Sequence, residues 1–209
     1  MTPASHPSAD ASPSRPLTDE ADSADMARLT DGHDAALNDL MERHAASLFR
    51  FLCRMLGNEE DANDLAQETF VRVYRNRDRF RQGQRFSTWL YTIAANLARN
   101  HLRWRERHPN VALDAAADDE SPPLRDTLPD GGPDAPGQME ATERVDAIRA
   151  AVAELPEELR APLLLAEYEE RSQKEIAVVL SCSVKAVETR IYRARQQLRA
   201  RLGRFLGKV

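Results

Sequence analysis

Long side chains with hydrogen-bond donors gather on one side of residues 184–199, near the end of the chain. Apolar residues recur there at helical spacing and predict one buried face: Val184, Val187, Ile191, Ala194 and Leu198. The opposite face carries or is flanked by six polar residues: Lys185, Thr189, Arg190, Tyr192, Arg193 and Gln196. Long cationic donors reach guanine edges or phosphates, and threonine and glutamine add hydrogen bonds to bases or backbone. The segment predicts a helix that contacts a nucleic-acid duplex. A solvated, arginine-rich helix also fits it, because cations favour the last turns of a helix.

A short helix with its own start signal precedes this segment. Ser172 and Glu175 have the S-x-x-E spacing of a capping box, which predicts a helix over about Gln173–Leu180. Ser-Cys-Ser at 181–183 then interrupts the pattern, and Ser183 can cap the following helix. Two short helices with a tight turn, the second with a basic outer face, are typical of a helix-turn-helix.

The charged residues are unevenly distributed along the chain. The net charge of −5, taken alone, argues against nucleic-acid binding. However, residues 70–108 carry ten basic and two acidic residues, and so do residues 171–208, so each segment has a net charge of +8. Local patches rather than the total charge determine the field that a polyanion meets. The sequence therefore predicts two separate basic surfaces.

The composition favours helices, because only 8 of 209 residues are glycine and 6% are aromatic. Residues 1–33 have almost no large apolar side chains and are expected to form a disordered tail. Residues 109–139 hold six prolines and three glycines, as a flexible acidic linker would. We therefore expect an all-α fold of two small helical domains, 34–108 and 140–207, joined by that linker.

Helices near 35–56, 59–75 and 87–107 are predicted within the first domain by apolar spacing. Gly57 ends the first of these and Asn58 caps the second. The helix over 59–75 is expected to present an acidic and partly apolar face outward, with Asp61, Asp64, Glu68, Val71 and Arg75.

No arrangement of side chains predicts catalysis, a metal site or a bound cofactor. The sequence shows no nucleophile–base pair, phosphate-binding loop or metal-ligand spacing. Two cysteines, Cys53 and Cys182, are too few for a disulfide framework and fit a reducing, cytoplasmic compartment. No apolar run has transmembrane length and the N-terminus lacks a signal pattern, so we expect no direct membrane insertion.

Two long motifs resemble the bacterial sigma factors. DANDLAQETFVRVYRNRDRF (61–80), followed by RFSTWLYTIAANLARNHLR (85–103), resembles their conserved region 2. LPEELRAPLLLAEYEERSQKEIAVVLSCSVKAVETRIYRARQQLR (155–199) resembles region 4. The short linker is similar to that of the extracytoplasmic-function branch (group 4) of the sigma-70 class. The resemblance implies a dissociable promoter-specificity subunit without catalytic activity, which reads the minus-35 duplex and opens the minus-10 element.

The resemblance also implies partners and residue roles. Expected partners are core RNA polymerase, through its beta-prime clamp helices and beta flap, promoter DNA, and a cognate anti-sigma factor. The polymerase-binding set is Asp61, Asp64, Leu65, Gln67, Glu68, Phe70, Val71 and Arg75. The minus-10 set is Phe80, Arg81, Arg85, Trp89, Thr92, Asn96, Arg99, Asn100 and Arg103, with Trp89 equally suited to anchor the core. Thr189, Tyr192 and Arg193 match positions that the family uses to contact the minus-35 duplex. Glu188 stands where several members of the family have a basic residue.

A stand-alone helix-turn-helix regulator is the main alternative, and an interaction protein of the adaptor or anti-sigma type is another. A simple regulator binds its operator alone, usually as a symmetric dimer. It has no obvious use for the second basic segment, 70–108, and the sequence shows no heptad seam for dimerisation. An adaptor would not need two basic surfaces. These features favour the sigma-factor interpretation.

Overall fold

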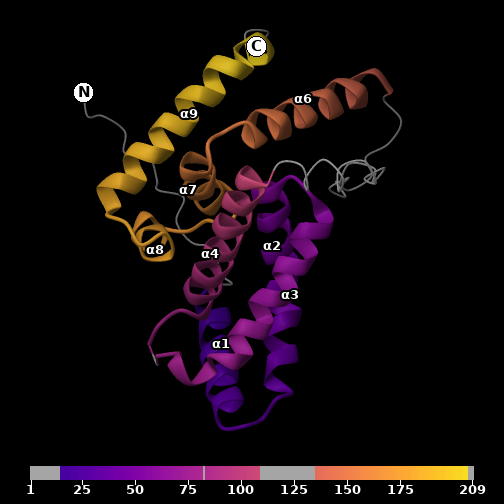
Figure 1. Ribbon diagram of the computed structural model, residues 1–209. Coiled ribbons are helices and arrows are strands. Elements are labelled where there is room, and N and C mark those ends of the chain that lie inside the picture. Colours follow the sequence, from indigo (N-terminus) through magenta and orange to yellow (C-terminus); the bar gives the residue numbers. More distant parts are fainter. Residues whose placement is uncertain (1–14, 82, 109–134, 207–209) are drawn as a thin grey trace, which may run out of the picture.

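A computed structural model describes residues 15–81, 83–108 and 135–206, and every regular element in these ranges is helical (Figure 1). The helices are α1 (Arg15–Thr30), α2 (Ala36–Leu56), α3 (Glu59–Arg75), the short 3-10 helix η1 (Arg77–Arg79), α4 (Phe86–Arg107), α6 (Ala135–Ala153), α7 (Glu157–Glu167), α8 (Gln173–Val179) and α9 (Val184–Leu206). The prediction of an all-α fold is confirmed. No described helix has the length and apolarity that crossing a bilayer demands.

The α2–α3 corner forms as its sequence predicts. Gly57 adopts a left-handed φ of 73°, and its N–H donates to the carbonyl of Cys53, which closes the end of α2. The Asn58 side chain accepts a 2.7 Å hydrogen bond from the backbone N–H of Asp61 and so caps α3. These two signals explain why the predicted helices 35–56 and 59–75 agree with the structure to within one residue.

Residues 15–30 form a helix, so the expectation of a disordered tail over 1–33 is wrong for this part; residues 1–14 lie outside the described residues. Met26 and Leu29 of α1 are 1% and 0% exposed and belong to the main hydrophobic cluster. Burial of these two large apolar side chains against α2 and α4 stabilises α1, which as an isolated helix would be only marginally stable.

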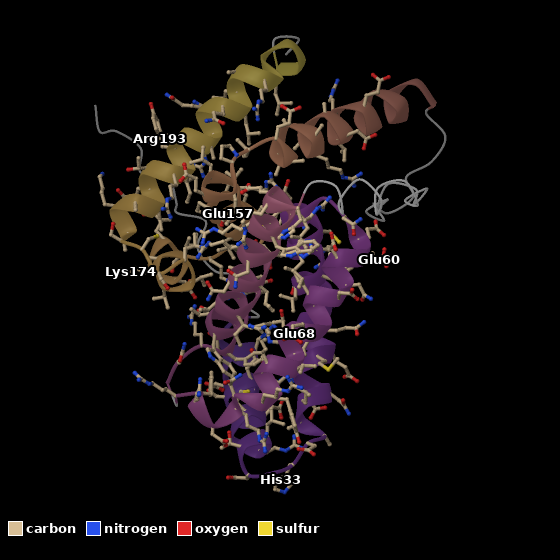
Figure 2. The ribbon with its side chains drawn as sticks, viewed as in Figure 1. His33, Glu60, Glu68, Glu157, Lys174 and Arg193 are labelled. Atoms are coloured by element: carbon tan, nitrogen blue, oxygen red, sulfur yellow. The ribbon has the colours of Figure 1, made fainter. Side chains whose placement is uncertain are left out.

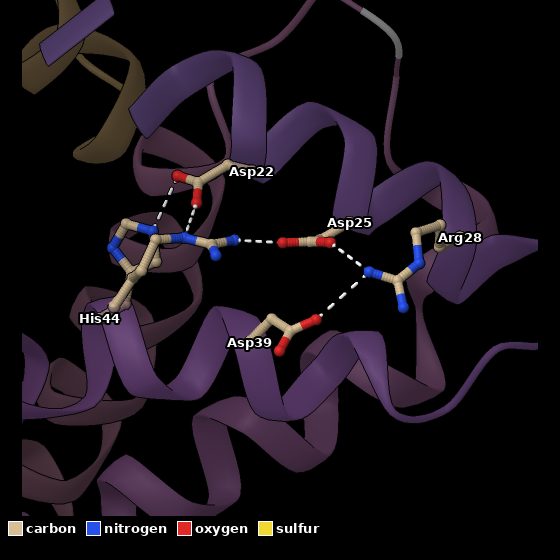
Figure 3. A network of polar contacts seen from close by, with 6 residues as sticks. Asp22, Asp25, Arg28, Asp39 and His44 are labelled. Carbon is tan, nitrogen blue, oxygen red and sulfur yellow. Dashed lines mark hydrogen bonds and ion pairs between the residues drawn. The ribbon is translucent and has the colours of Figure 1, made fainter. Parts of the chain in front are cut away.

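A polar network fixes α1 against α2 (Figure 3). The guanidinium of Arg43 donates to Asp22 at 2.9 Å and to Asp25 at 2.5 Å. His44 Nε2 lies 2.7 Å from the other carboxylate oxygen of Asp22, and both side chains are buried. Arg28 joins Asp25 to Asp39 on α2, at 2.9 Å and 3.2 Å. Buried carboxylates are tolerated here because each has charged or hydrogen-bonding partners.

The C-terminal helices form a helix-turn-helix. Ser172 and Glu175 make the predicted capping box at the start of α8, with both reciprocal hydrogen bonds present. Ser183 Oγ accepts from the backbone N–H of Ala186 at 3.2 Å and caps α9, also as predicted. α7 packs across both α8 and α9 and holds their angle. Val184, expected to be buried, is instead partly exposed at the first residue of α9.

The N-terminal helices α1–α4 and the C-terminal helices α6–α9 pack against each other. α7 contacts α2, α8 contacts α4, and one hydrophobic cluster contains residues of both sets (Figure 1). Arg160 on α7 also donates 2.6 Å to the carbonyl of Met55 at the end of α2. Of the predicted linker 109–139, residues 109–134 lie outside the described residues and α6 begins at Ala135. The division into domains at these boundaries stays a prediction.

Candidate nucleic-acid interface

The outer face of α9 is open. Lys185, Thr189, Tyr192, Arg193 and Gln196 are exposed, and Arg190 is half-buried. Figure 2 shows Arg193 on the side of α9 that faces away from α1–α4. Its side chain has no hydrogen bond or ion pair within the described residues, whereas Gln196 donates to Tyr192 Oη at 2.6 Å. Tyr192 is 61% exposed, although a tyrosine ring buries favourably. The predicted minus-35 residues therefore share one accessible surface.

An aromatic cluster stands where the basic loop enters α4. The rings of Phe80 and Trp89 lie 5.3 Å apart, and both rings lie 6.4 Å from that of Phe86. Phe86 is buried, and Phe80 and Trp89 are half-buried against the core. This packing favours the anchoring role for Trp89. It leaves part of the Phe80 ring and part of the Trp89 ring accessible to a nucleobase.

Residues of the predicted minus-10 set have two kinds of environment on α4 and its loop. Arg81, Asn96, Asn100 and Arg103 are exposed. Thr92 is half-buried and donates 2.7 Å to the carbonyl of Thr88. The set therefore lies along one helix and its loop, but only part of it is open.

Two arginines of this set are paired with acids of the C-terminal helices. Arg85 donates to Glu175 at 2.7 Å, and its Nε lies 3.0 Å from a carboxylate oxygen of Asp19 on α1. Arg99 donates to Glu157 at 3.2 Å and, more weakly, to Asn96 at 3.5 Å. The sequence did not identify Glu157 or Asp19 as partners of these arginines, and it indicated Glu175 only as a helix cap. Contacts between residues 58 and 90 positions apart have no signal in local sequence spacing.

These contacts perturb the ionisation of Glu175. Burial acts to raise the pKa of its carboxyl, but hydrogen bonds from Ser172 and Arg85, together with the charge of Arg85, lower that pKa to about 2. The hydrogen bond to Glu175 outweighs desolvation and raises the pKa of Arg85. Both groups are therefore charged throughout the physiological pH range.

The predicted polymerase-binding set on α3 is only partly exposed. Asp64, Gln67, Val71 and Arg75 face solvent, and Glu68 pairs with Arg72 at 2.7 Å. Figure 2 shows Glu60 and Glu68 on α3, the helix at the far side of the molecule from Arg193.

Three members of that set are not on its open surface. Phe70 is 4% exposed and lies in the core, and Leu65 is half-buried against it. Asp61, expected to point outward, contacts α4 instead, at 3.1 Å from His101 and 3.3 Å from Arg105. Phe70 follows Ala62 and Ala66 at intervals of four, so the helical period that buries those alanines also buries Phe70.

Comparison with known proteins gives two family matches. The sigma-70 region 2 family matches residues 40–108, and the sigma-70 region 4 family matches residues 146–198. The first match runs from within α2 to the end of α4, and the second runs from within α6 to within α9 and includes the helix-turn-helix.

Similar proteins cover most of the chain. The RNA polymerase sigma-H factor of Pseudomonas aeruginosa is 34% identical over 87% of this chain and 94% of its own length. The ECF RNA polymerase sigma factor SigW of Bacillus subtilis is 34% identical over 82% of this chain and 91% of its own. Among solved structures, CnrH in complex with the cytosolic domain of CnrY has a TM-score of 0.63 and 27% identity, covering 88% of this chain and 97% of CnrH. Sigma factors are transcription initiation factors rather than enzymes, and their two matched regions imply binding to core RNA polymerase and promoter DNA. This chain belongs to the extracytoplasmic-function family of RNA polymerase sigma factors.

Proposed function

We propose that this sigma factor assigns promoter reading, promoter opening and polymerase binding to three separate surfaces. α9 reads the minus-35 duplex, the Phe80–Arg85 loop with α4 holds the opened minus-10 strand, and α3 binds the beta-prime clamp helices. The C-terminal helices α6–α9 also contact the beta flap. One observation carries this proposal: an open donor face on α9 and a separate basic, aromatic surface on α4 occur in one chain.

The minus-35 role rests on the geometry of α9. A capped helix-turn-helix presents its second helix to a major groove, and Arg193 projects from the exposed face of that helix. Arginine donates to guanine O6 and N7 or to phosphate. Thr189 donates to the carbonyl of Lys185, and its hydroxyl oxygen can still accept from a base. Glu188 pairs with Lys185 at 3.0 Å, which reduces its repulsion of the DNA backbone.

The minus-10 role rests on chemistry suited to a single strand. Holding a base outside the stack costs a few kcal/mol, which aromatic surfaces and a positive groove offset. Phe80 and Trp89 supply ring surface, and Arg81 and Arg103 supply exposed charge. The amide of Asn96 has both a donor and an acceptor to read a base edge. We therefore assign base selection to Asn96 and backbone contacts to the arginines.

The polymerase-binding role is assigned to the open part of α3. Asp64, Gln67, Val71 and Arg75 combine a carboxylate, an amide, an apolar side chain and a cation on one exposed surface. A basic partner helix would pair with Asp64 and cover Val71. Asp61 and Phe70 support this surface from beneath, through α4 and the core.

We also propose that an anti-sigma factor controls the chain in the cytoplasm. CnrH, which shares the fold over nearly its whole length, was solved with the cytosolic domain of CnrY. A protein that needs core polymerase and promoter DNA must reach both, and in bacteria these occupy the cytoplasm.

Reconstitution with core polymerase tests the proposed function. The purified chain should bind core enzyme in a pull-down, and the holoenzyme should start run-off transcripts at discrete sites on a genomic fragment library. Asp64→Lys should abolish capture without changing the circular dichroism melt. Glu42→Lys, the same reversal at an exposed position on α2, should leave capture intact. If the chain without core enzyme binds a duplex tightly and specifically, the proposed dependence of promoter reading on core polymerase is wrong.

A further inference from the structure

The first turns of α9 carry an exposed ion pair. Lys185 Nζ donates to a carboxylate oxygen of Glu188 at 3.0 Å, and the two side chains are 86% and 42% exposed. Residues three and four apart are neighbours on a helix, so this pair adjoins Thr189 and Tyr192 on the open side of α9. The pair therefore presents a cation and a carboxylate side by side to any ligand of that surface.

Helix stability does not account for this pair. α9 begins at Val184, so Lys185 lies in the first turn, which holds no acidic residue. The positive end of the helix dipole disfavours a cation at this place. An exposed ion pair also contributes little to stability, because water and salt screen it. The two charges are therefore better explained by something that α9 binds.

Their place in the helix-turn-helix indicates what that is. In this motif the N-terminal residues of the second helix contact base edges in the major groove. Lys185 and Glu188 lie within the first two turns of α9, whereas Arg193 and Gln196 follow further along the helix. The ion pair is thus placed to read bases, next to the contacts already assigned to Arg193.

The chemistry of the pair matches one base pair better than the others. A G·C pair presents guanine N7 and O6 as acceptors and the cytosine N4 amino group as a donor. Lysine offers only donors, and a carboxylate offers only acceptors. Guanine O6 and cytosine N4 are hydrogen-bonded to each other and so lie about 2.9 Å apart. The 3.0 Å between Lys185 Nζ and the Glu188 oxygen matches this spacing, so the ion pair can bond across a G·C pair without separating.

An A·T pair fits the same two side chains less well. Its amino group, adenine N6, lies between two acceptors, adenine N7 and thymine O4. A carboxylate that accepts from this amino group therefore meets the thymine oxygen, and the thymine methyl group lies beside it. In a G·C pair the amino group stands at the end of the row of acceptors, which removes this repulsion.

We propose that Lys185 and Glu188 act as one unit that reads a single G·C pair of the minus-35 element. Lys185 donates to the guanine, and Glu188 accepts from the cytosine N4 amino group. This inference rests on the proposed function, because it requires α9 to lie in the major groove of that element. Glu188 is then a specificity determinant and not merely a charge that opposes the DNA backbone.

Selection from a randomised minus-35 region tests the reading unit. The template is a promoter located by run-off transcription, with its minus-35 region randomised, and the templates retained by holoenzyme are sequenced. Holoenzyme is made with the wild-type full chain or with Lys185→Ala, Glu188→Ala or Glu188→Gln. The control is Glu158→Ala, which removes the same charge from an exposed position on α7. Circular dichroism melts verify that every variant is folded.

Wild type and the control should favour G·C over A·T at one minus-35 position by about tenfold, the usual discrimination of a good pair of base contacts. Lys185→Ala and Glu188→Ala should both reduce this preference to about twofold or less, at that same position, and leave the other positions unchanged. Glu188→Gln should shift the position toward A·T, because glutamine bonds to both N6 and N7 of adenine.

Three results would overturn the reading unit. Glu188→Ala could strengthen binding to every sequence equally, which would make the carboxylate a repulsive charge only. The two alanine variants could alter different positions, or neither could alter any. If wild-type holoenzyme still enriches a minus-35 element in these cases, the proposed function stands and only the reading unit is wrong. If it enriches none, the minus-35 role of α9 is wrong as well.

Discussion

Phe70 and Val71 are adjacent in sequence but have opposite surroundings. Phe70 is 4% exposed within the core, and Val71 is 40% exposed on the open part of α3. Phe70→Ala should lower the free energy of unfolding by about 3–5 kcal/mol, because it leaves a cavity. Val71→Ala should change stability by no more than about 0.5 kcal/mol and should instead weaken capture by core polymerase. Urea unfolding and a pull-down measure both effects. Normal stability of the Phe70 variant would contradict the burial.

Glu169 makes stability depend on pH. Burial raises the pKa of its carboxyl above 4.5, and this outweighs the hydrogen bond from Tyr91 and the charges of Arg171, Arg50 and Arg54. A raised pKa means that the folded state favours the protonated form, so this contribution is present below pH 4.5 and is lost as the pH rises through the raised pKa.

Glu169→Gln should therefore raise the melting temperature at pH 7, because glutamine still accepts from Tyr91 and carries no charge. The difference from wild type should vanish below about pH 4.5, where both side chains are neutral. Thermal melts of the two proteins across this range measure the difference directly. A lower melting temperature for the variant at pH 7 would mean that attraction to the three arginines exceeds the cost of burial.

At the scale of single residues, the sequence predicted exposure well where one helix face decides it. Five of the six predicted donors on α9 are open as expected, because the apolar residues opposite them have a core to face, and Arg190 on the flank is half-buried. Asp61 was misplaced for a different reason. It lies on the flank of α3, and only the position of α4, with His101 and Arg105, turns that flank into an ion-pairing site.

At the scale of elements, boundaries with local signals were predictable and α1 was not. Gly57, Asn58 and Ser172 act on their own backbone neighbours, so their effect is written in the nearby sequence. α1 has few large apolar residues, and its charged residues resemble those of a solvated tail. Its stability comes from Arg43 of α2 and from the core beneath Leu29, and neither is visible in the sequence pattern of that helix itself.

Leu29→Ala should therefore destabilise the protein by about 2–5 kcal/mol, since the side chain is completely buried. Glu20→Ala, an exposed position on the same helix, should change stability by no more than about 0.5 kcal/mol. Urea denaturation followed by circular dichroism compares the two. If Leu29→Ala behaves like Glu20→Ala, α1 does not dock in solution and the sequence-based expectation of a tail was right.

At the scale of the whole molecule, the packing of α7 and α8 on α2 and α4 had no sequence signal. Glu157 and Glu175 each have a sufficient local explanation, because acids suit the first turn of a helix and complete a capping box. Their second role, as partners of Arg99 and Arg85, exists only when distant segments meet. Family resemblance implies a DNA-binding role for those arginines but does not reveal these intramolecular ion pairs.

The proposed separation of duplex reading from strand opening predicts opposite defects for two substitutions. Arg193→Ala should weaken closed-complex formation by holoenzyme by about 1–3 kcal/mol, the usual contribution of a good base or phosphate contact. It should have little effect on a template whose minus-10 region is already single-stranded. Asn96→Ala should leave duplex engagement intact and impair opening and selection at one minus-10 position, because its amide is exposed on α4, the same helix that carries Trp89. Binding measurements and permanganate footprinting on duplex and pre-melted templates distinguish these steps. Loss of the same step in both variants would show that one surface performs both tasks, and the assignment of α4 and α9 to different DNA states would have to be abandoned.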